Sequence, residues 1–195
     1  LSFEEALERT VRWYLGEGRS LLAPSARRAM MSGAFYKRKD LMESFSFQNK
    51  GRLLFGEDRT GEFARLAAGL SKRALVVCGA HFSRSGELAG LEQALEAAGV
   101  RVWVEPDLSS PSIEQARAMM ELCRRQSIGL VIGVGGATVM DFAKIVAYGA
   151  AQQRDVWPEI EQRGEPRGGS RLALATVSTY PSSGSDMDGA AEMVE

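Results

Sequence analysis

The 195-residue sequence has little histidine and cysteine, with one His and two Cys. The lone histidine, His81, cannot form a histidine-rich metal site, and it gives no basis for a Ser–His–Asp triad. Cys78 and Cys123 lie too far apart in the sequence for Cys-x-x-Cys chemistry, so we expect two buried thiols. This use of cysteine favours a reducing, cytoplasmic compartment.

An excess of one charge and a long apolar run are also missing. The formal net charge is −1, which gives no reason to expect nucleic acid or an anionic membrane as a partner. No apolar run approaches the roughly 20 residues that span a bilayer. The N-terminus carries acidic residues and lacks the continuous apolar core of a signal peptide. With 45% hydrophobic and 25% charged residues, the composition is that of an ordinary soluble protein with one core.

Helices and strands are predicted to alternate after Gly56. The predicted strands cover residues 74–78, 100–105, 130–134 and 172–177, and the predicted helices cover 63–70, 86–98, 110–126 and a stretch after Gly136. Before them, the apolar positions at 45, 47 and 53–55 indicate two short strands. This alternation predicts parallel βαβ crossovers, and therefore an α/β fold with a Rossmann-like open parallel sheet and flanking helices. Ligands of such sheets bind at the carboxyl ends of the strands.

A glycine cluster follows the third strand of this series and opens a helix. Gly135 and Gly136 let the backbone turn sharply and approach a ligand closely. The first N–H groups of the helix have no internal partner, and its dipole favours an anion, so the segment predicts a phosphate site. The hydroxyl of Thr138 can donate a hydrogen bond to a phosphate oxygen. Asp141 would either position a loop or accept a hydrogen bond from a hydroxyl of the ligand. A second interpretation is that these glycines serve only close packing of the helix on the strand.

Two other polar turns follow predicted strands. After Cys78 the turn contains Ser83 and Arg84 but no acidic residue before Glu87. Because a carboxylate selects the ribose 2′-hydroxyl and a basic residue admits a 2′-phosphate, this turn favours NADP; an ordinary exposed loop is the alternative. The stretch 176–189 is rich in hydroxyls and glycine and is either a loop or the lining of a phosphate or ribose pocket.

Three motifs in register resemble the iron-containing (group III) alcohol dehydrogenase family, in particular its butanol dehydrogenase-like branch. The family's opening, approximately MxNFxFxNPTKxxFG, resembles Met42–Gly56. Its GGGSxxDxxK resembles Gly135–Lys144, and its PATGSExNGGAV resembles Pro181–Glu192. The sequence departs from the family pattern at Ala137, Thr138, Ser183, Asp186 and Glu192.

The resemblance implies the nucleotide-binding domain of a dehydroquinate synthase-like fold, with NADP or NAD as its cofactor. It places Gly135, Gly136, Ala137 and Thr138 around the pyrophosphate, with Asp141 beside them. It places Gly79 where NAD is distinguished from NADP, next to Ser83 and Arg84. Finally, it places Ser182, Ser183 and Ser185 near the cofactor.

The resemblance also implies an oxidoreductase that transfers hydride between the nicotinamide and a small alcohol or aldehyde. The family holds a divalent metal, iron or zinc, with an aspartate and three histidines on a helical C-terminal domain, and no such residues are recognisable here. We therefore expect no metal ligand and no catalytic residue in this chain, and no turnover by it alone. The alternatives are a relative of glycerol dehydrogenase or dehydroquinate synthase, and a non-catalytic nucleotide-binding module. A second copy of the chain is a further candidate partner.

Both ends of the chain look cut, because it begins at Leu1 and stops at Glu195 without a closing signal. Residues 42–195 are predicted to form the nucleotide-binding α/β domain, truncated before the helical metal-binding domain. Residues 1–41 are predicted to form a helical extension, with a helix over Phe3–Leu15, and a basic linker. The first eighteen residues resemble the C-terminal helix of sugar-nucleotide epimerases and dehydratases, so a fusion remnant and a plain extension both remain open.

Overall fold

The computed structural model describes residues 51–152, 154–158, 171–179, 184–186 and 191–193. All of them fall within one compact unit, Asn49–Glu195. The helix predicted over Phe3–Leu15, the basic linker and the strand predicted at 45–47 lie outside the described residues. The division of the chain at residue 42 therefore stays a prediction.

Four parallel strands form one sheet with the order β2-β1-β3-β4. They are β1 (Arg73–Cys78), β2 (Arg101–Glu105), β3 (Leu130–Gly135) and β4 (Ala173–Ser178). Each strand was predicted within one or two residues. The central strands β1 and β3 pair from Ala74 opposite Leu130 to Cys78 opposite Val134. The predicted α/β fold with an open parallel sheet is confirmed.

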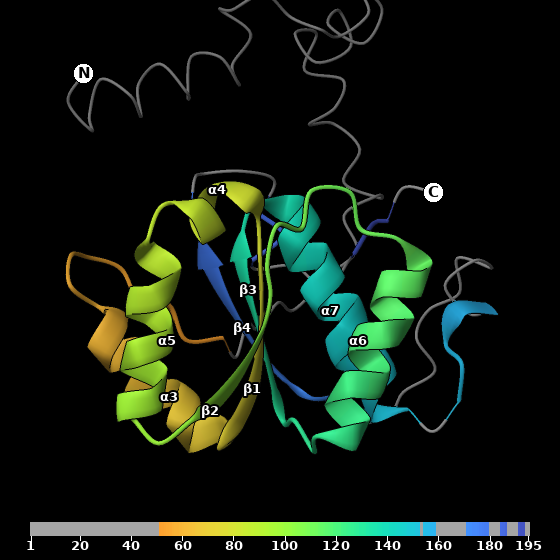
Figure 1. Cartoon of the computed structure of the whole chain (residues 1–195), viewed down its shortest axis with the longest axis horizontal. Helices are drawn as coiled ribbons and strands as arrows, with labels where there is room; N and C mark the ends of the chain where they lie inside the picture. Colours follow the sequence, from red (N-terminus) through yellow and green to blue (C-terminus); the bar gives the residue numbers. More distant parts are fainter. Residues whose placement is uncertain (1–50, 153, 159–170, 180–183, 187–190, 194–195) are drawn as a thin grey trace, which may run out of the picture. The chain divides into compact units, whose positions relative to one another are not determined.

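Helices cover both faces of this sheet, as Figure 1 shows. On one side lie α3 (Thr60–Leu70), α4 (Ala80–Arg84) and α5 (Glu87–Ala97); on the other lie α6 (Ile113–Arg125) and α7 (Ala137–Ala151). The chain leaves β1 toward β2 through α4 and α5, then crosses the other face through α6 to reach β3. The direction of winding therefore reverses between β1 and β3. Open α/β sheets bind ligands at such a switch point.

The core consists of two apolar layers that the pleat of the central strands separates. Leu75, Val77 and Val131 face α6 and α7, whereas Val76 and Ile132 belong to the layer on the opposite face. Successive side chains of a strand point to opposite faces, so a strand covered on both sides must be apolar throughout. All six residues of β3 are buried. This explains the uninterrupted apolar runs that predicted β1 and β3.

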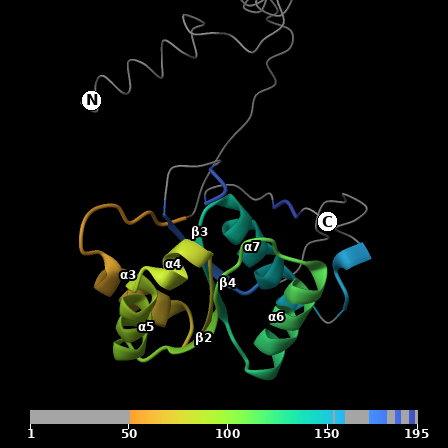
Figure 2. The same cartoon turned by 45° about the horizontal axis from the view of Figure 1, so that its top comes forward.

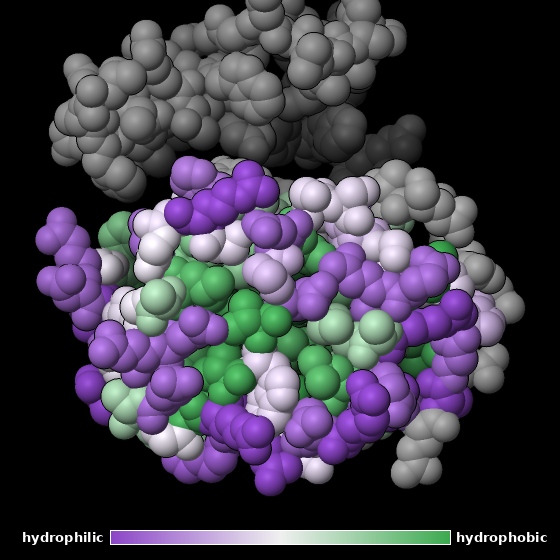
Figure 3. Space-filling view, viewed as in Figure 1, coloured by the Kyte–Doolittle hydropathy of each residue, from purple (hydrophilic) through white to green (hydrophobic). Residues whose placement is uncertain are grey.

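The outer strands are less buried than the central ones. From Val102 to Glu105, β2 is only half-buried, and β4 is half-buried over most of its length. Figure 3 shows apolar surface in the middle of the face on which Figure 1 draws β2, with hydrophilic residues around it. On this strand the guanidinium of Arg101 lies 4.8 Å from the ring centre of Trp103, so a cationic group covers part of the apolar surface.

Three local predictions were wrong. Residues 53–55 form no strand; Leu53 and Phe55 are 72% and 89% exposed, so no buried face fixes an extended pairing. The helix expected from residue 110 begins at Ile113, because the hydroxyl of Ser112 accepts from the Gln115 N–H at 3.1 Å and caps it there. The turn after β1, expected as a loop, contains the five-residue helix α4.

Two helix ends follow the residues that predict them. Gly99 has φ +79° and ends α5, with the N–H of Val100 donating to Leu95 O at 2.9 Å. Ser127 adopts the same left-handed region after α6, where the N–H of Ile128 donates to Cys123 O.

Within the described part of the chain, no helix combines the length and the apolar character that crossing a membrane requires.

The two cysteines should be unreactive while the chain is folded. Both are free and buried, and burial raises the pKa of the Cys78 thiol and raises that of Cys123 to about 12. Because the thiolate is the reactive form, we expect neither to react with a thiol reagent such as DTNB at pH 8 in native buffer. In denaturant both should react at once. Rapid labelling of either cysteine in native buffer would contradict this packing.

Candidate functional site

A cleft of about 250 Å³ lies at the carboxyl ends of the strands. Its wall residues come from the end of β3 and from the segments that follow each of the four strands: Gly79, Ala80, His81, Phe82, Leu108, Ser109, Gly135, Gly136, Thr138, Val139 and Thr179. Figure 2, which brings this end of the sheet forward, shows α4 and the start of α7 on either side of the end of β3. The cleft thus lies at the switch point between β1 and β3, and the turns at Gly79 and Gly135–Gly136 both line it at the carboxyl edge of the sheet.

The glycines of β3 let α7 lie very close to the strand. A Cβ at Gly133 would lie 3.0 Å from the Ala143 Cβ, and one at Gly135 would lie 2.9 Å from Val139 Cγ2. Gly135 also has φ +156°, which side chains rarely adopt. These contacts support a packing role for Gly133 and Gly135, and a further role of the turn in phosphate binding stays a prediction. The two roles are compatible, because this packing places the start of α7 at the cleft.

The first turn of α7 presents to the cleft backbone donors for which the described residues supply no acceptor. Gly136 caps the helix and has no side chain that could occupy those donors. Its carbonyl accepts from the N–H groups of Val139 and Met140, both at 3.1 Å, whereas those of Ala137 and Thr138 precede any acceptor within the helix. The first turn carries no acidic residue, and Thr138 is exposed. A pyrophosphate fits this arrangement of donors and dipole.

Asp141, one turn further along α7, binds the C-terminal polar segment. Its Oδ1 accepts from the Ser185 hydroxyl at 2.5 Å and from Lys144 Nζ at 3.3 Å, and its Oδ2 accepts from the Glu192 N–H at 3.2 Å. Lys144 also donates to Ser185 Oγ at 2.9 Å. The side chains of Asp141 and Lys144 are only 15% and 11% exposed. Of the two roles expected for Asp141, these contacts match the positioning of a loop.

Of the three serines predicted to lie near the cofactor, only Ser185 is among the described residues. Ser185 is 4% exposed, and its hydroxyl is engaged by both Asp141 and Lys144. Ser182 and Ser183 lie outside the described residues. Direct contact of these three serines with a cofactor therefore stays a prediction.

An acidic residue that sequence reasoning missed lies beside Ser83 and Arg84. The Ser83 hydroxyl donates to Asp107 Oδ1 at 2.5 Å, and Arg84 Nε lies 3.7 Å from the same oxygen. Within the turn itself no acidic residue precedes Glu87, whereas Asp107 follows the neighbouring strand β2. The available signal was an aspartate directly after Pro106, at the carboxyl end of a predicted strand.

Metal-ligating side chains do not gather in the part of the chain that the structure describes. There, no group of three or more His, Cys, Asp or Glu residues is placed to hold an ion. His81 is exposed at the wall of the cleft, and Cys78 is buried beneath the turn. The described residues therefore do not fit a metal, but they fit the phosphates of a dinucleotide.

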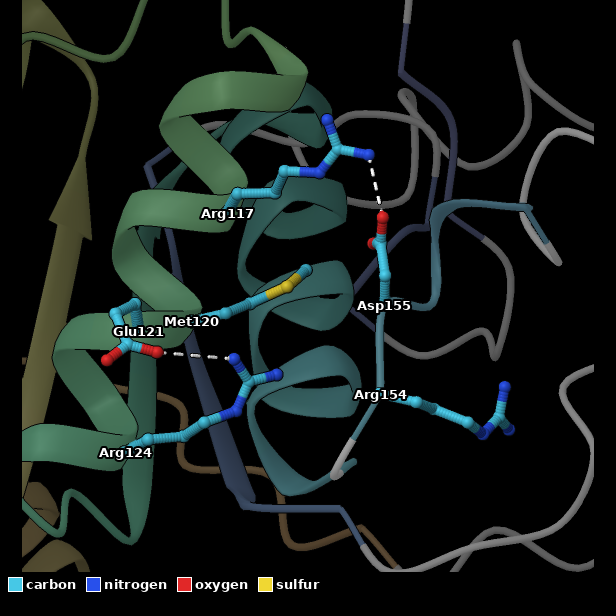
Figure 4. Close-up of a pocket in the computed structure, with 6 residues that line it drawn as sticks. All are labelled: Arg117, Met120, Glu121, Arg124, Arg154 and Asp155. Carbon is cyan, nitrogen blue, oxygen red and sulfur yellow. Dashed lines mark hydrogen bonds and ion pairs between the residues drawn. The ribbon is translucent and has the colours of Figure 1, made fainter.

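A larger pocket of about 640 Å³ lies between α6 and residues 154–155 (Figure 4). Arg117 pairs with Asp155 at 2.8 Å, and Arg124 contacts Glu121 at 3.6 Å and donates to Gly149 O at 2.8 Å. The N–H of Trp157 and the guanidinium of Arg117 hold the pKa of Asp155 below its usual value. These contacts tie α6 to the end of α7 and the segment after it, so we interpret the pocket as part of the scaffold.

Comparison with known proteins points to a single family. The family model described as iron-containing alcohol dehydrogenase matches residues 50–195. A probable NADH-dependent butanol dehydrogenase of Bacillus subtilis is 31% identical over 155 residues, which are 75% of this chain and 38% of that protein. An NADPH-dependent aldehyde reductase of Escherichia coli is 28% identical over 156 residues, 77% of this chain and 39% of the relative. The chain spans about two fifths of the length of these curated relatives.

Solved structures give the same fold. An NADH-dependent butanol dehydrogenase of Thermotoga maritima superposes with a TM-score of 0.68 at 23% identity, covering 76% of this chain and 37% of that one. An iron-containing alcohol dehydrogenase of the same organism superposes with a TM-score of 0.64 at 25% identity, covering 74% of this chain and 40% of the other. Both matches extend over most of the described residues.

Substituting Gly135 should destabilise the fold. In Gly135→Ala the new Cβ would contact Val139 at 2.9 Å in a backbone conformation that alanine resists. We expect a loss of about 1–3 kcal/mol in the free energy of unfolding, measured with urea. Gly90→Ala is the matched control, because Gly90 is exposed on α5 with nothing within 4 Å of the added Cβ, and it should stabilise by about 0.5–1 kcal/mol. Equal midpoints for the two variants would contradict the packing.

Removing the charge of Asp141 should loosen the C-terminal segment. In Asp141→Asn one acceptor oxygen becomes an NH₂ donor, which must face either the Glu192 N–H or the hydroxyl and ammonium of Ser185 and Lys144. We expect hydrogen exchange of the peptide containing Glu192 to become at least about tenfold faster, since a charge-assisted bond contributes roughly 1.5–3 kcal/mol. Asp58→Asn, an exposed carboxylate, is the control. Unchanged exchange in Asp141→Asn would show that Asp141 does not hold this segment.

Proposed function

The chain belongs to the iron-containing alcohol dehydrogenase family, and we propose that its described residues bind NAD(H) or NADP(H) for hydride transfer with a small alcohol or aldehyde. The observation that carries this proposal is the cleft at the switch point of the sheet, with the start of α7 at its wall. The names of the relatives support it, since they include both NADH-dependent and NADPH-dependent enzymes.

Each wall of the cleft has a task in binding. The N–H groups of Ala137 and Thr138, with the Thr138 hydroxyl, would hold the pyrophosphate, and the open backbone at Gly135 and Gly136 lets it approach. Gly79 and the turn after β1 would face the adenosine ribose. Asp141 would act as a positioning residue, since it fixes the segment around Ser185. The bound nicotinamide would supply or accept the hydride.

Metal binding is not assigned to the described residues. Iron or zinc, which the family resemblance implies, requires a cluster of ligands, and the described residues contain none. We therefore propose that this 195-residue chain binds the dinucleotide but does not oxidise alcohols by itself. The two buried, free cysteines support placement in the reducing cytoplasm.

Isothermal titration of the chain with NADH, NADPH and ADP tests the proposal. We expect at least one dinucleotide to bind more tightly than ADP and to be displaced by inorganic pyrophosphate, because the pyrophosphate contacts the start of α7. Thr138→Val removes a hydroxyl donor without changing the shape of the side chain and should weaken binding about fivefold, since one hydrogen bond contributes about 1 kcal/mol.

Thr60→Val is the control, because Thr60 also begins a helix but lies outside the cleft. Its affinity should equal that of the wild type. Binding of neither dinucleotide would refute the proposal. ADP binding as tightly as the dinucleotides would instead favour a nucleotide-binding module with no use for nicotinamide.

A further inference from the structure

Asp107 lies in the loop that follows β2 (Arg101–Glu105), directly before two residues of the cleft wall. The next two residues, Leu108 and Ser109, line the cleft, and the Leu108 N–H donates to Cys78 O at 2.9 Å. This bond ties the loop to the end of β1, where the turn expected to meet the ribose begins. Asp107 itself has φ +59°, a left-handed conformation that aspartate and asparagine adopt more readily than most residues.

The Asp107 carboxylate engages both groups on which an NADP preference would depend. Ser83 Oγ lies 2.5 Å from Asp107 Oδ1 and 3.1 Å from Ala80 O, so its single proton is engaged by these two acceptors, and Arg84 Nε lies 3.7 Å from the same carboxylate oxygen. The second carboxylate oxygen, Oδ2, makes no hydrogen bond or ion pair with any described residue, and the side chain is 52% exposed. One oxygen is therefore occupied from inside the turn, and the other remains available to a ligand.

We propose, on the basis of the dinucleotide binding proposed above, that Asp107 is a specificity-determining residue that makes this site select NADH over NADPH. The 2′-hydroxyl of NADH can donate to Oδ2 of Asp107. A 2′-phosphate in its place would bring a second negative group against the carboxylate, while Ser83 and Arg84 are already engaged. The sequence pattern alone favoured the opposite cofactor, because the acidic residue belongs to a different strand.

The ion pair of Arg84 does not cancel this effect. Its side chain is 75% exposed, so solvent weakens the pair and a phosphate could draw the guanidinium away. The charge of Asp107 would remain after such a movement, and the bond from the Leu108 N–H to Cys78 O holds that charge beside the cleft wall. Discrimination should accordingly fall as the ionic strength rises, because salt screens the repulsion.

Titration of the full 195-residue chain with NADH and with NADPH tests this role. We expect the wild type to bind NADH at least tenfold more tightly than NADPH. Asp107→Asn suits the same backbone conformation but removes the charge, and it should reduce the ratio of affinities about tenfold. The change should consist of tighter NADPH binding and weaker NADH binding, whereas a general loss of structure would weaken both.

Asp58→Asn is the matched control, since Asp58 is exposed, has φ +55° and changes the net charge equally. Its ratio should equal that of the wild type. Adding Arg84→Ala to Asp107→Asn should remove part of the gain in NADPH affinity, because the released guanidinium would contact the 2′-phosphate. An unchanged ratio in Asp107→Asn, or a wild type that prefers NADPH, overturns the role of Asp107 and leaves dinucleotide binding intact. Failure of both dinucleotides to bind overturns the proposed function and this inference together.

Discussion

The close approach of α7 to β3 is the constraint on which the candidate site depends. On the face that meets α7, β3 presents Val131, then Gly133, then Gly135, so its side chains shrink toward the carboxyl end. The start of the helix can therefore lie almost in contact with the backbone of the strand. A side chain at either glycine would push the helix away, and with it the N–H groups that face the cleft. Packing and the proposed binding of a pyrophosphate therefore place one requirement on the same two residues.

Burial of α7 on nearly all sides follows from this position. Nine of its fifteen residues are buried, because the helix packs against α6, against β3 and β4, and beside the segment around Ser185. An apolar surface that continues around a helix is typical of one enclosed by its protein. The exceptions are informative. Asp141 and Lys144, three residues apart and therefore on one side of the helix, reach Ser185 and Glu192 and attach the C-terminal segment to the helix that lines the cleft.

The elements of the fold could be predicted from the sequence wherever a local pattern of residues determines the structure. The central strands are uninterrupted apolar runs, and the end of α5 follows from Gly99, so these elements were placed within one or two residues. Where a long-range contact decides, local patterns failed. The apolar residues 53–55 indicate a strand only if something buries them, and Leu53 and Phe55 are exposed. The start of α6 depended on whether Pro111 or the capping hydroxyl of Ser112 ends the preceding loop.

The candidate site shows the same limit in its electrostatics. Gly135, Gly136 and Thr138 were predicted together because a strand, a turn and a helix succeed one another in the chain. Asp107 was missed because its partner Ser83 is 24 residues away and meets it only across the carboxyl edge of the sheet. In a parallel sheet each strand contributes one short loop to that edge, so the charge at any point is the sum over several loops. The composition of a single loop therefore cannot decide whether the site favours a ribose with a 2′-hydroxyl or one with a 2′-phosphate.

Topology distinguishes the two pockets better than their size does. The larger one, beside α6, is lined by charged groups that pair with one another, and these contacts hold α6 to the end of α7 and the residues after it. The smaller one is surrounded by loops from all four strands and faces backbone donors that the helix itself cannot satisfy. A ligand entering the larger pocket must compete with existing ion pairs, whereas an anion entering the smaller one would supply an acceptor that the described residues do not provide. The smaller pocket lies where the winding reverses between β1 and β3, so loops of several strands meet there. The position of a pocket at this switch point, rather than its volume, therefore favours it as the candidate site.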